Sequence, residues 1–326
     1  MLGGTAVQLG VVVVTVLGLW VGARLLVDAV VRLAQRFGLS ELTIGLTVVA
    51  AGTSTPELAV TADAALKGLG DIAVGNVLGS NIYNLAFVLG VVAFVRAIPI
   101  AESLVRRDGL ALLASTLVGG AVLFDRTVTR LEGGVLVGLF VVYTAYLLLT
   151  GRPPVEAVES NGGTAAASAV TTDATERVSF RGRDGLLLVG GLALVLVSGD
   201  LLVQAASALA RGAGISEWVV GGTIVAAGTS TPEFAVSLVA IRRGSLGISV
   251  GNVVGSNVFN VVGVMGLAAV IRPLAVGPAA LETLGWLLGV SVVMVAALWS
   301  GRVLSRVEGA LFAGSELVRW ALNLLG

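Results

Sequence analysis

The sequence predicts an all-α, polytopic membrane protein with ten transmembrane helices, arranged as two inverted five-helix repeats. First, its 326 residues are 56% hydrophobic and only 12% charged, whereas a soluble domain is about 25% charged. Second, residues 38–90 and 214–266 align without a gap at an offset of 176, with 29 of 53 positions identical. Third, apolar runs long enough to cross a bilayer recur five times in each half.

Each expected span needs roughly 20 apolar residues. Such runs fall at residues 6–35, 42–66, 71–95, 107–124 and 130–150, and again at 184–210, 218–241, 246–270, 279–299 and 303–325. Glu308, Glu316 and Arg319 interrupt the last run, but its Val307-Glu308-Gly309 aligns with Leu131-Glu132-Gly133 of the fifth. The first run lacks the charged start and cleavage site of a signal peptide, so we expect it to be retained.

A polar segment rich in Pro, Gly, Ser and Thr separates the two halves at residues 151–182. This composition is typical of a flexible, solvent-exposed linker. We therefore divide the chain into a first five-helix repeat at residues 1–150, the linker at 151–182 and a second five-helix repeat at 183–326.

Five spans is an odd number, so the second repeat must enter the membrane the opposite way up. Inverted repeats are typical of transporters whose sites lie at the bilayer midplane. With the N-terminus outside, 13 arginines fall on the cytoplasmic side and 6 Lys or Arg on the external side, Arg24 left out. Because positive charge favours the cytoplasm, we expect a cell-membrane protein with an external N-terminus and a cytoplasmic linker.

Composition also excludes several kinds of chemistry. The formal net charge is zero, which gives no reason to expect a nucleic-acid partner. The chain has no cysteine and no histidine, so the usual thiol nucleophile, proton shuttle and zinc ligands are missing. We expect no cofactor, and we expect the lipid bilayer as the surroundings.

A Pro-Glu pair lies within an apolar run in each repeat, at Pro56-Glu57 and Pro232-Glu233. Carboxylates inside a membrane are costly and mark function. Each proline leaves the carbonyl four residues earlier, at Gly52 or Gly228, without its helical donor, and the glycines loosen the same turn. We therefore predict a helix kink beside each glutamate.

Further oxygen-bearing side chains recur around both glutamates. They are Thr53, Ser54, Ser80 and Asn84 in the first repeat, and Thr229, Ser230, Ser256 and Asn260 in the second. Carboxylate, hydroxyl and carbonyl oxygens without nitrogen or sulfur suit a hard cation such as Ca²⁺ or Na⁺. Taken singly, a proline kink or a membrane serine is more often structural; their duplication together with a glutamate favours an ion site.

Small residues and asparagines accompany these oxygens. Gly75 and Gly79, like Gly251 and Gly255, form faces that allow another helix to approach closely. We expect the helix that bears the glutamate to be that partner, which would bring Ser80 and Asn84 near Glu57.

Other polar residues have weaker claims on the ions. For Asn76 and Asn252, helix cross-linking and ion binding both remain open. Asn81 and Asn257 are expected to be structural. So are Asp28 and Asp200, which align with Gln204 and Arg24 rather than with each other.

The pair GTSTPE…GNVLGSN and GTSTPE…GNVVGSN resembles the α-repeats of the sodium/calcium exchanger membrane family, prokaryotic type, within the cation/calcium antiporter superfamily. The resemblance implies alternating access, with a sliding pair of gating helices and a rigid core. It implies an ion site at Glu57 and Glu233, with Thr53, Thr229, Ser54, Ser230, Ser80, Ser256, Asn84, Asn260 and the carbonyls near Ala50 and Ala226. Many sodium/calcium members carry Asp where this chain has Asn260.

The predicted function is antiport of Ca²⁺ against Na⁺. Two carboxylates balance one Ca²⁺ or two Na⁺, so the two ions would compete for one site. A Ca²⁺/H⁺ or other cation antiporter is the alternative, although proton-coupled relatives carry an acidic residue in the segment matching GNVLGSNIYN, and this chain has none between Asp71 and Glu102. A channel, and an intramembrane hydrolase with Ser54 or Ser230 as nucleophile, are more remote alternatives.

Overall fold

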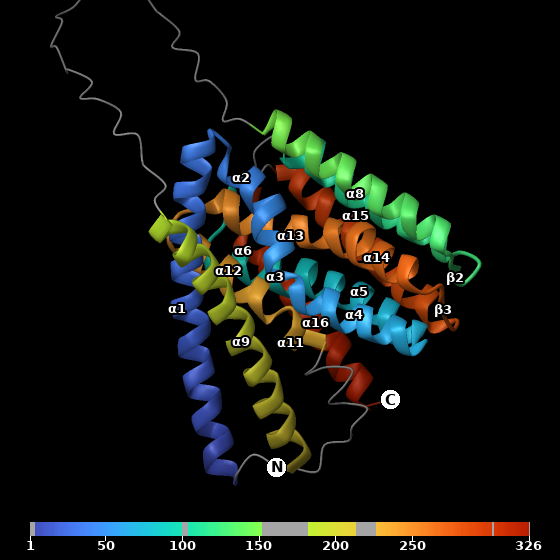
Figure 1. The fold of residues 1–326 in the computed structure, drawn as a ribbon, viewed down its shortest axis with the longest axis horizontal. Helices are drawn as coiled ribbons and strands as arrows, with labels where there is room; N and C mark the ends of the chain where they lie inside the picture. Colours follow the sequence, from blue (N-terminus) through green and yellow to red (C-terminus); the bar gives the residue numbers. More distant parts are fainter. Residues whose placement is uncertain (1–3, 100–103, 152–181, 213–225, 302, 326) are drawn as a thin grey trace, which may run out of the picture.

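The computed structural model is a bundle of helices (Figure 1). It describes residues 4–99, 104–151, 182–212, 226–301 and 303–325. Within these residues, 6 helices are long and apolar enough to cross a membrane. They cover Thr5–Phe37, Gly70–Val95, Arg130–Thr150, Gly182–Ala205, Leu246–Ile271 and Ala279–Trp299.

The first half begins with the long helix α1 (Thr5–Phe37), which ends at Gly38 in the left-handed conformation that glycine adopts without strain. The elements that follow are α2 (Glu41–Ile44), the π-helical turn η1 (Gly45–Val49), α3 (Ala50–Thr53), α4 (Thr55–Lys67), α5 (Gly70–Ile82), η2 (Tyr83–Val88), α6 (Leu89–Val95), β1 (Ile98–Pro99), η3 (Leu104–Gly109), α7 (Leu110–Leu123), β2 (Thr127–Val128) and α8 (Arg130–Thr150).

Where it is described, the second half follows the same order, except that one helix, α15, takes the place of η3 and α7. Its elements are α9 (Gly182–Gly212), α11 (Ala226–Thr229), α12 (Thr231–Arg242), α13 (Leu246–Val258), η5 (Phe259–Val264), α14 (Met265–Ile271), β3 (Leu274–Ala275), α15 (Ala279–Gly301), β4 (Val303–Leu304) and α16 (Arg306–Leu325). Residues 176 apart in the two halves are called repeat mates below.

Contacts between the halves come in matched pairs. Ile98 of β1 pairs with Leu304 of β4, and their repeat mates Leu274 of β3 and Val128 of β2 pair with each other. Close backbone approaches follow the same rule: Gly90 meets Gly309, while the mates Gly133 and Gly266 meet each other. The two halves are therefore interlocked rather than placed side by side.

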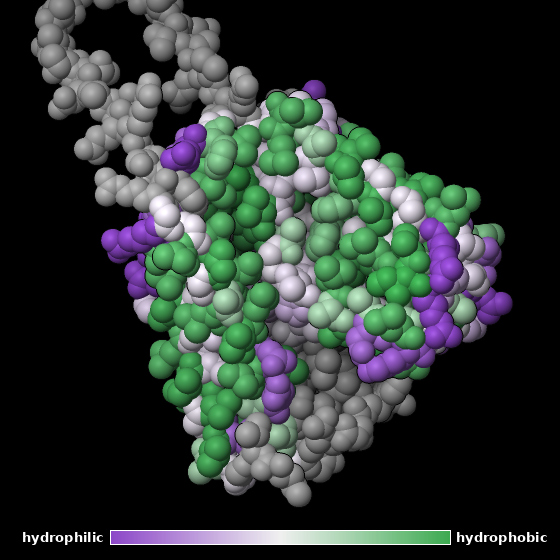
Figure 2. Space-filling view, viewed as in Figure 1, coloured by the Kyte–Doolittle hydropathy of each residue, from purple (hydrophilic) through white to green (hydrophobic). Residues whose placement is uncertain are grey.

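Two long helices, α1 and α9, lie side by side at one edge of the molecule (Figure 1), and they pack together over much of their length. The other long helices stack across the remainder of the molecule, with α13 almost wholly buried in the middle. Hydrophobic residues cover most of the face shown in Figure 2, and hydrophilic residues gather over β2, β3 and the end of α4, and near the start of α9.

Most predicted spans coincide with helices, but three differ. The run at 42–66 is not one kinked helix: it is broken at Ser54 into α2–η1–α3 and α4. The described part of the run at 218–241 is likewise broken at Ser230 into α11 and α12. The last run begins with the short strand β4, and its helix starts only at Arg306. Residues 218–225 of the seventh predicted span and nearly all of the predicted linker lie outside the described residues.

Candidate functional site: two buried glutamates between broken helices

Each glutamate lies in the first turn of a helix that begins directly after a one-residue break between two helices. Ser54, with φ −81° and ψ 15°, separates α3 from α4, and Ser230, with φ −89° and ψ 8°, separates α11 from α12. Pro56 and Pro232 occupy the first turn of the new helix, where a missing N–H costs nothing. The helix N-terminus favours negative charge. Sequence thus places the Pro-Glu pairs where a membrane-buried carboxylate is best tolerated.

The two carboxylates are held across the boundary between the halves. Glu57 and Glu233 are both 0% exposed. Ser230 donates a 2.8 Å hydrogen bond to Oε1 of Glu57, and its repeat mate Ser54 donates one of 2.7 Å to Oε1 of Glu233. Neither glutamate is thus fixed by its own half alone.

Predicted hydroxyls complete each carboxylate's surroundings. Ser256 donates to Oε1 of Glu233 at 3.3 Å, and Thr53 also contacts that carboxylate. Ser80 contacts the carboxylate of Glu57 and lies 3.5 Å from the hydroxyl of Thr229. The structure therefore brings together all six predicted hydroxyls.

Several buried polar atoms of the predicted ligands have no hydrogen-bond partner among the described residues. They are Oε2 of Glu57, Oε2 of Glu233, both amide atoms of Asn84 and Oδ1 of Asn260. Buried polar groups are normally paired, because leaving one unpaired costs free energy. A pair of buried carboxylates, each with one unpaired oxygen, is chemically suited to hold a desolvated cation.

Asn76 and Asn252 fix the glutamate helices. Asn252 donates to the backbone carbonyl of Glu233 at 3.2 Å and to Ser237 at 2.9 Å. Asn76 does the same to Glu57 at 3.2 Å and to Thr61 at 3.0 Å. Of the two roles left open, the geometry favours cross-linking. Sequence reasoning missed Thr61 and Ser237, although both lie four residues after a glutamate.

Asn81 and Asn257 join the halves at the centre, but unequally. Asn81 donates to the backbone carbonyl of Asn257 at 3.0 Å, and Asn260 donates to Oδ1 of Asn81 at 3.1 Å. The mate of the second contact would join Asn84 to Oδ1 of Asn257, yet both of these groups are unpaired among the described residues.

Asn84 and Asn260 each lie in a π-helical turn, in η2 and η5. Such turns are rare and frequently occur at functional sites. Each interrupts an otherwise continuous helix, α5–α6 or α13–α14. The sequence carried no signal that predicted these turns.

For Gly251 and Gly255 the predicted partner, a glutamate-bearing span, comes from the opposite half and not from their own, while Gly75 and Gly79 have no described atom within 4 Å of an added Cβ. Gly251 and Gly255 of α13 approach the backbone of Leu42 and Leu46 in the opposite half, not the glutamate helix of their own half. A Cβ at Gly255 would lie 2.5 Å from the carbonyl oxygen of Leu46. This close approach also places Ser256 where it can donate to the carbonyl of Ala50 at 3.5 Å. Ala226, the repeat mate of Ala50, begins α11.

The carbonyl freed by Pro56 has a partner within the chain. The hydroxyl of Thr55 donates to the carbonyl of Gly52 at 2.7 Å. This carbonyl therefore has a hydrogen-bond donor without an ion. The Gly-Pro spacing produces a break in the helix and leaves no free carbonyl at Gly52. Next to this break, Thr53 donates to Oδ1 of Asn252 in the other half at 3.0 Å.

A cavity of about 470 Å³ adjoins the site. It lies between α4, α9 and the α11–α12 break, and Pro56, Thr229 and Pro232 line it. On the repeat-related side, α1 packs against α12. Val236 and Val27 there are 0% and 1% exposed, whereas their mates Val60 and Val203 are only half-buried. The two sides of the site therefore differ in access.

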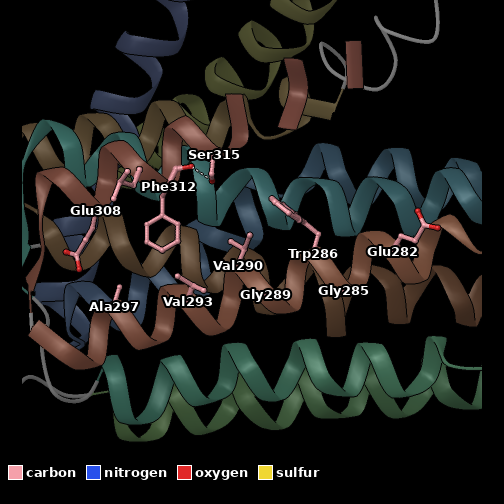
Figure 3. Close-up of a pocket in the computed structure, with 11 residues that line it drawn as sticks. Glu282, Gly285, Trp286, Gly289, Val290, Val293, Ala297, Glu308, Phe312 and Ser315 are labelled. Carbon is pink, nitrogen blue, oxygen red and sulfur yellow. Dashed lines mark hydrogen bonds between the residues drawn. The ribbon is translucent and has the colours of Figure 1, made fainter. Parts of the chain in front are cut away.

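A second groove, of about 650 Å³, lies elsewhere, between α15 and α16 (Figure 3). Val290, Val293 and Phe312 give it apolar walls, and Glu282 and Glu308 lie toward its two ends. Glu308 is engaged with Ser305 as a helix cap. None of the predicted ion ligands lines this groove.

Comparison with known proteins agrees with this geometry. A model of the family described as "Sodium/calcium exchanger protein" matches residues 7–149 and 185–315, well over half of the chain. The chain belongs to this family. It is therefore a membrane-embedded, multi-pass cation antiporter of the calcium-exchanger type, a transporter and not an enzyme.

Relatives of this exchanger include the inner membrane protein YrbG of Escherichia coli, 37% identical over 78% of this chain and 77% of YrbG. The sodium/calcium exchanger MaX1 of Methanosarcina acetivorans is 29% identical over 88% of this chain and 90% of MaX1. A structure of the sodium-calcium exchanger NCX_Mj soaked with Na⁺ and Sr²⁺ matches with a TM-score of 0.80 at 29% identity, covering 96% of this chain and 97% of that one.

Proposed function

We propose that this exchanger moves Ca²⁺ against Na⁺ across the cell membrane by alternating access at the Glu57–Glu233 site. The observation that carries the proposal is the pair of fully buried carboxylates, each held by a serine of the other half and each with one oxygen unpaired among the described residues. The flanking ligands are those predicted above: Thr53, Thr229, Ser54, Ser230, Ser80, Ser256, Asn84, Asn260 and the carbonyls at Ala50 and Ala226.

Charge balance explains why two cations would share this site. Two carboxylates carry a charge of −2, which one Ca²⁺ or two Na⁺ neutralise. Leaving such a pair uncompensated in a low-dielectric interior would cost several kcal/mol. Each ion therefore leaves only when the other replaces it, and this competition couples the two fluxes.

The unequal packing of the repeat mates supports alternating access. The site adjoins a cavity between α9 and α4, while α1 is packed against α12 on the other side. Exchanging these two arrangements between the repeats would open the opposite side and close the present one. The α1–α9 pair would move as a unit past the core, because the two helices pack on each other.

The proposed topology has ten spans in two inverted repeats, at residues 1–150 and 183–326, joined by a cytoplasmic linker at 151–182. The mate-for-mate contacts between the halves support an internal two-fold relation. The two stretches matched by the family model, 7–149 and 185–315, support the division. The excess of arginine on the linker side supports an external N-terminus.

Sodium is preferred to protons as the coupling ion. Protonating both glutamates would also neutralise the site, but the unpaired oxygens of Asn84 and Asn260 would then coordinate no cation in that half-cycle. With sodium as the coupling ion, these oxygens coordinate a cation in both half-cycles, Ca²⁺ in one and Na⁺ in the other. Ca²⁺/H⁺ exchange on the same scaffold is the alternative, and the relation of this chain to MaX1, a sodium/calcium exchanger, supports the sodium reading.

Equilibrium binding to the purified protein tests the proposal. Radiocalcium should bind at one saturable site, and Na⁺ should displace it at constant pH with a Hill coefficient near 2. Glu57→Gln should abolish this binding. Displacement by acidification alone, with Na⁺ ineffective at hundreds of millimolar, would contradict sodium coupling.

A further inference from the structure

Helix α1 makes two ion pairs that differ in what they join. Arg32 of α1 pairs with Asp184 of α9 at 2.7 Å. Asp28, one turn earlier, pairs with Arg243, which directly follows α12. The first ion pair lies within the α1–α9 unit. The second connects that unit to the helix that carries Glu233.

Other charged groups beside this second pair are already engaged. Arg24 lies over the ring of Trp20, 4.5 Å from its centroid. Arg32 is held by Asp184. Asp28 and Arg243 line the same small pocket at this end of α1, so their ion pair lies in the contact between α1 and the end of α12.

The two positions related to this ion pair by the repeat cannot form an ion pair of their own. The repeat mate of Asp28 is Gln204, and that of Arg243 is Lys67. Gln204 donates to Asp200 on its own helix at 2.8 Å, and Lys67 pairs with Asp63 on its own helix at 2.6 Å. A neutral amide has replaced the carboxylate, so no equivalent ion pair would form between α9 and the end of α4.

The ion pair lies on the closed side of the site. It joins α1 to the end of α12, where the path to the glutamates is packed shut, whereas the cavity opens between α9 and α4. Opening the closed side requires α1 to leave α12. That movement would separate Asp28 from Arg243, while Arg32 and Asp184 would move together.

We propose that the Asp28–Arg243 ion pair is a latch that holds the site closed on its own face and so makes the two faces of the exchanger inequivalent. This rests on the proposed alternating access. In the proposed topology the latched face is cytoplasmic. Both side chains are partly exposed, at 40% for Asp28 and 28% for Arg243, and ion pairs of this kind shift an equilibrium by about two- to fivefold. The latch therefore biases the exchanger without locking it.

Thiol accessibility tests the latch, since the chain has no cysteine of its own. Ala59→Cys reports on the cavity face, and Ala235→Cys, at its repeat mate, reports on the latched face. Under saturating Ca²⁺, a membrane-impermeant thiol reagent should modify Ala59→Cys faster. Asp28→Asn and Arg243→Gln should each raise the rate at Ala235→Cys by two- to fivefold and lower the rate at Ala59→Cys.

Controls separate a latch from a general loss of packing. Asp184→Asn breaks the ion pair within the α1–α9 unit and should change neither rate. The double reversal Asp28→Arg with Arg243→Asp should restore the wild-type rates. Asp63→Asn with Gln204→Asp frees Lys67 and supplies the missing carboxylate, so it should hold the cavity face closed, lowering the rate at Ala59→Cys and raising the rate at Ala235→Cys as Asp28→Asn does.

Unchanged rates in Asp28→Asn and Arg243→Gln would overturn the latch. The proposed function would survive that result, provided that replacing Ca²⁺ by Na⁺ or by neither ion still altered the two rates in opposite directions. Equal and ion-independent rates at both reporters would instead contradict alternating access itself.

Discussion

At the scale of single residues, the site depends on two carboxylates that neither half can hold alone. Glu57 accepts from Ser230 and Glu233 accepts from Ser54, so each side chain is oriented by the opposite repeat. The duplicated Pro-Glu pair in an apolar run predicts that these two glutamates form the site, and the structure buries both between the halves. It could not predict this crossing of partners, because each serine donates to a glutamate that is 173 or 179 positions away in the sequence.

Replacing either glutamate by glutamine should abolish calcium transport and leave the fold intact. Glu57→Gln or Glu233→Gln keeps the shape of the side chain but removes half of the charge at the site. Radiocalcium flux should fall by more than about tenfold, which is a loss of about 1.4 kcal/mol or more. The elution profile and the thermal melting curve should remain close to wild type.

Glu132 and Glu308 provide matched controls. Each caps its own helix by accepting from a Thr or Ser three residues earlier, Thr129 or Ser305. Glutamine preserves a capping box, so Glu132→Gln and Glu308→Gln should transport calcium at near-normal rates. Near-normal transport by Glu57→Gln or Glu233→Gln would show that the central site is wrongly assigned.

Asn260→Asp should alter sodium dependence more than calcium binding. The substitution adds a third negative charge near the site and removes the amide that donates to Oδ1 of Asn81 at 3.1 Å. The half-saturating Na⁺ concentration should move by several-fold, with a smaller change in the calcium affinity. A calcium affinity that moved more than the sodium dependence would contradict a role for position 260 in sodium binding.

At the scale of elements, the glycines of α13 set how closely the halves approach. A Cβ at Gly255 would meet the carbonyl oxygen of Leu46 at 2.5 Å and the Cβ of Ala50 at 2.8 Å. Gly255→Ala should therefore push α13 away from α2–η1–α3 and lower the stability by about 1–3 kcal/mol.

A helical glycine without such contacts provides the control for Gly255. Gly138 of α8 has no described atom within 4 Å of an added Cβ, so Gly138→Ala should be neutral or slightly stabilising. Thermal melting of the detergent-solubilised protein gives both comparisons. Equal melting temperatures for the two variants would show that α13 does not need its close contact.

The helices were largely predictable because their boundaries depend on local composition. Apolar length and the charges between spans fixed α8 at Arg130–Thr150 and placed α13–α14 within one residue. The π-helical turns at Asn84 and Asn260 were not predictable. Tyr83–Val88 and Phe259–Val264 are apolar segments with one asparagine each, and this composition does not distinguish a π-helical turn from the α-helix on either side.

At the scale of the whole molecule, one sequence repeat is packed in two ways. Val60 and Val236 are repeat mates, yet only Val236 is fully buried, because α1 covers α12 while a cavity separates α9 from α4. Sequence similarity predicts equivalent roles for the two repeats. It cannot predict which of two arrangements each repeat adopts, since that depends on the state of the whole transporter.

The inverted topology makes a prediction that labelling can check. Cysteines introduced at Ser160 in the linker and at Lys67 at the end of α4 should react with an impermeant reagent from opposite sides of the membrane. Inside-out and right-side-out vesicles distinguish the two sides. Reaction of both from the same side would require an even number of spans between them and would overturn the five-plus-five arrangement.

The central claim, that one two-glutamate site couples calcium to sodium, is tested most directly by radiocalcium flux into proteoliposomes under an imposed Na⁺ gradient at constant pH. The account predicts that calcium moves in the direction opposite to the flow of Na⁺ and that its flux reverses when the Na⁺ gradient is reversed. It predicts no flux in Glu57→Gln or Glu233→Gln. Calcium flux driven by a pH gradient in sodium-free buffer, at a rate equal to the sodium-driven one, would contradict it and favour Ca²⁺/H⁺ exchange.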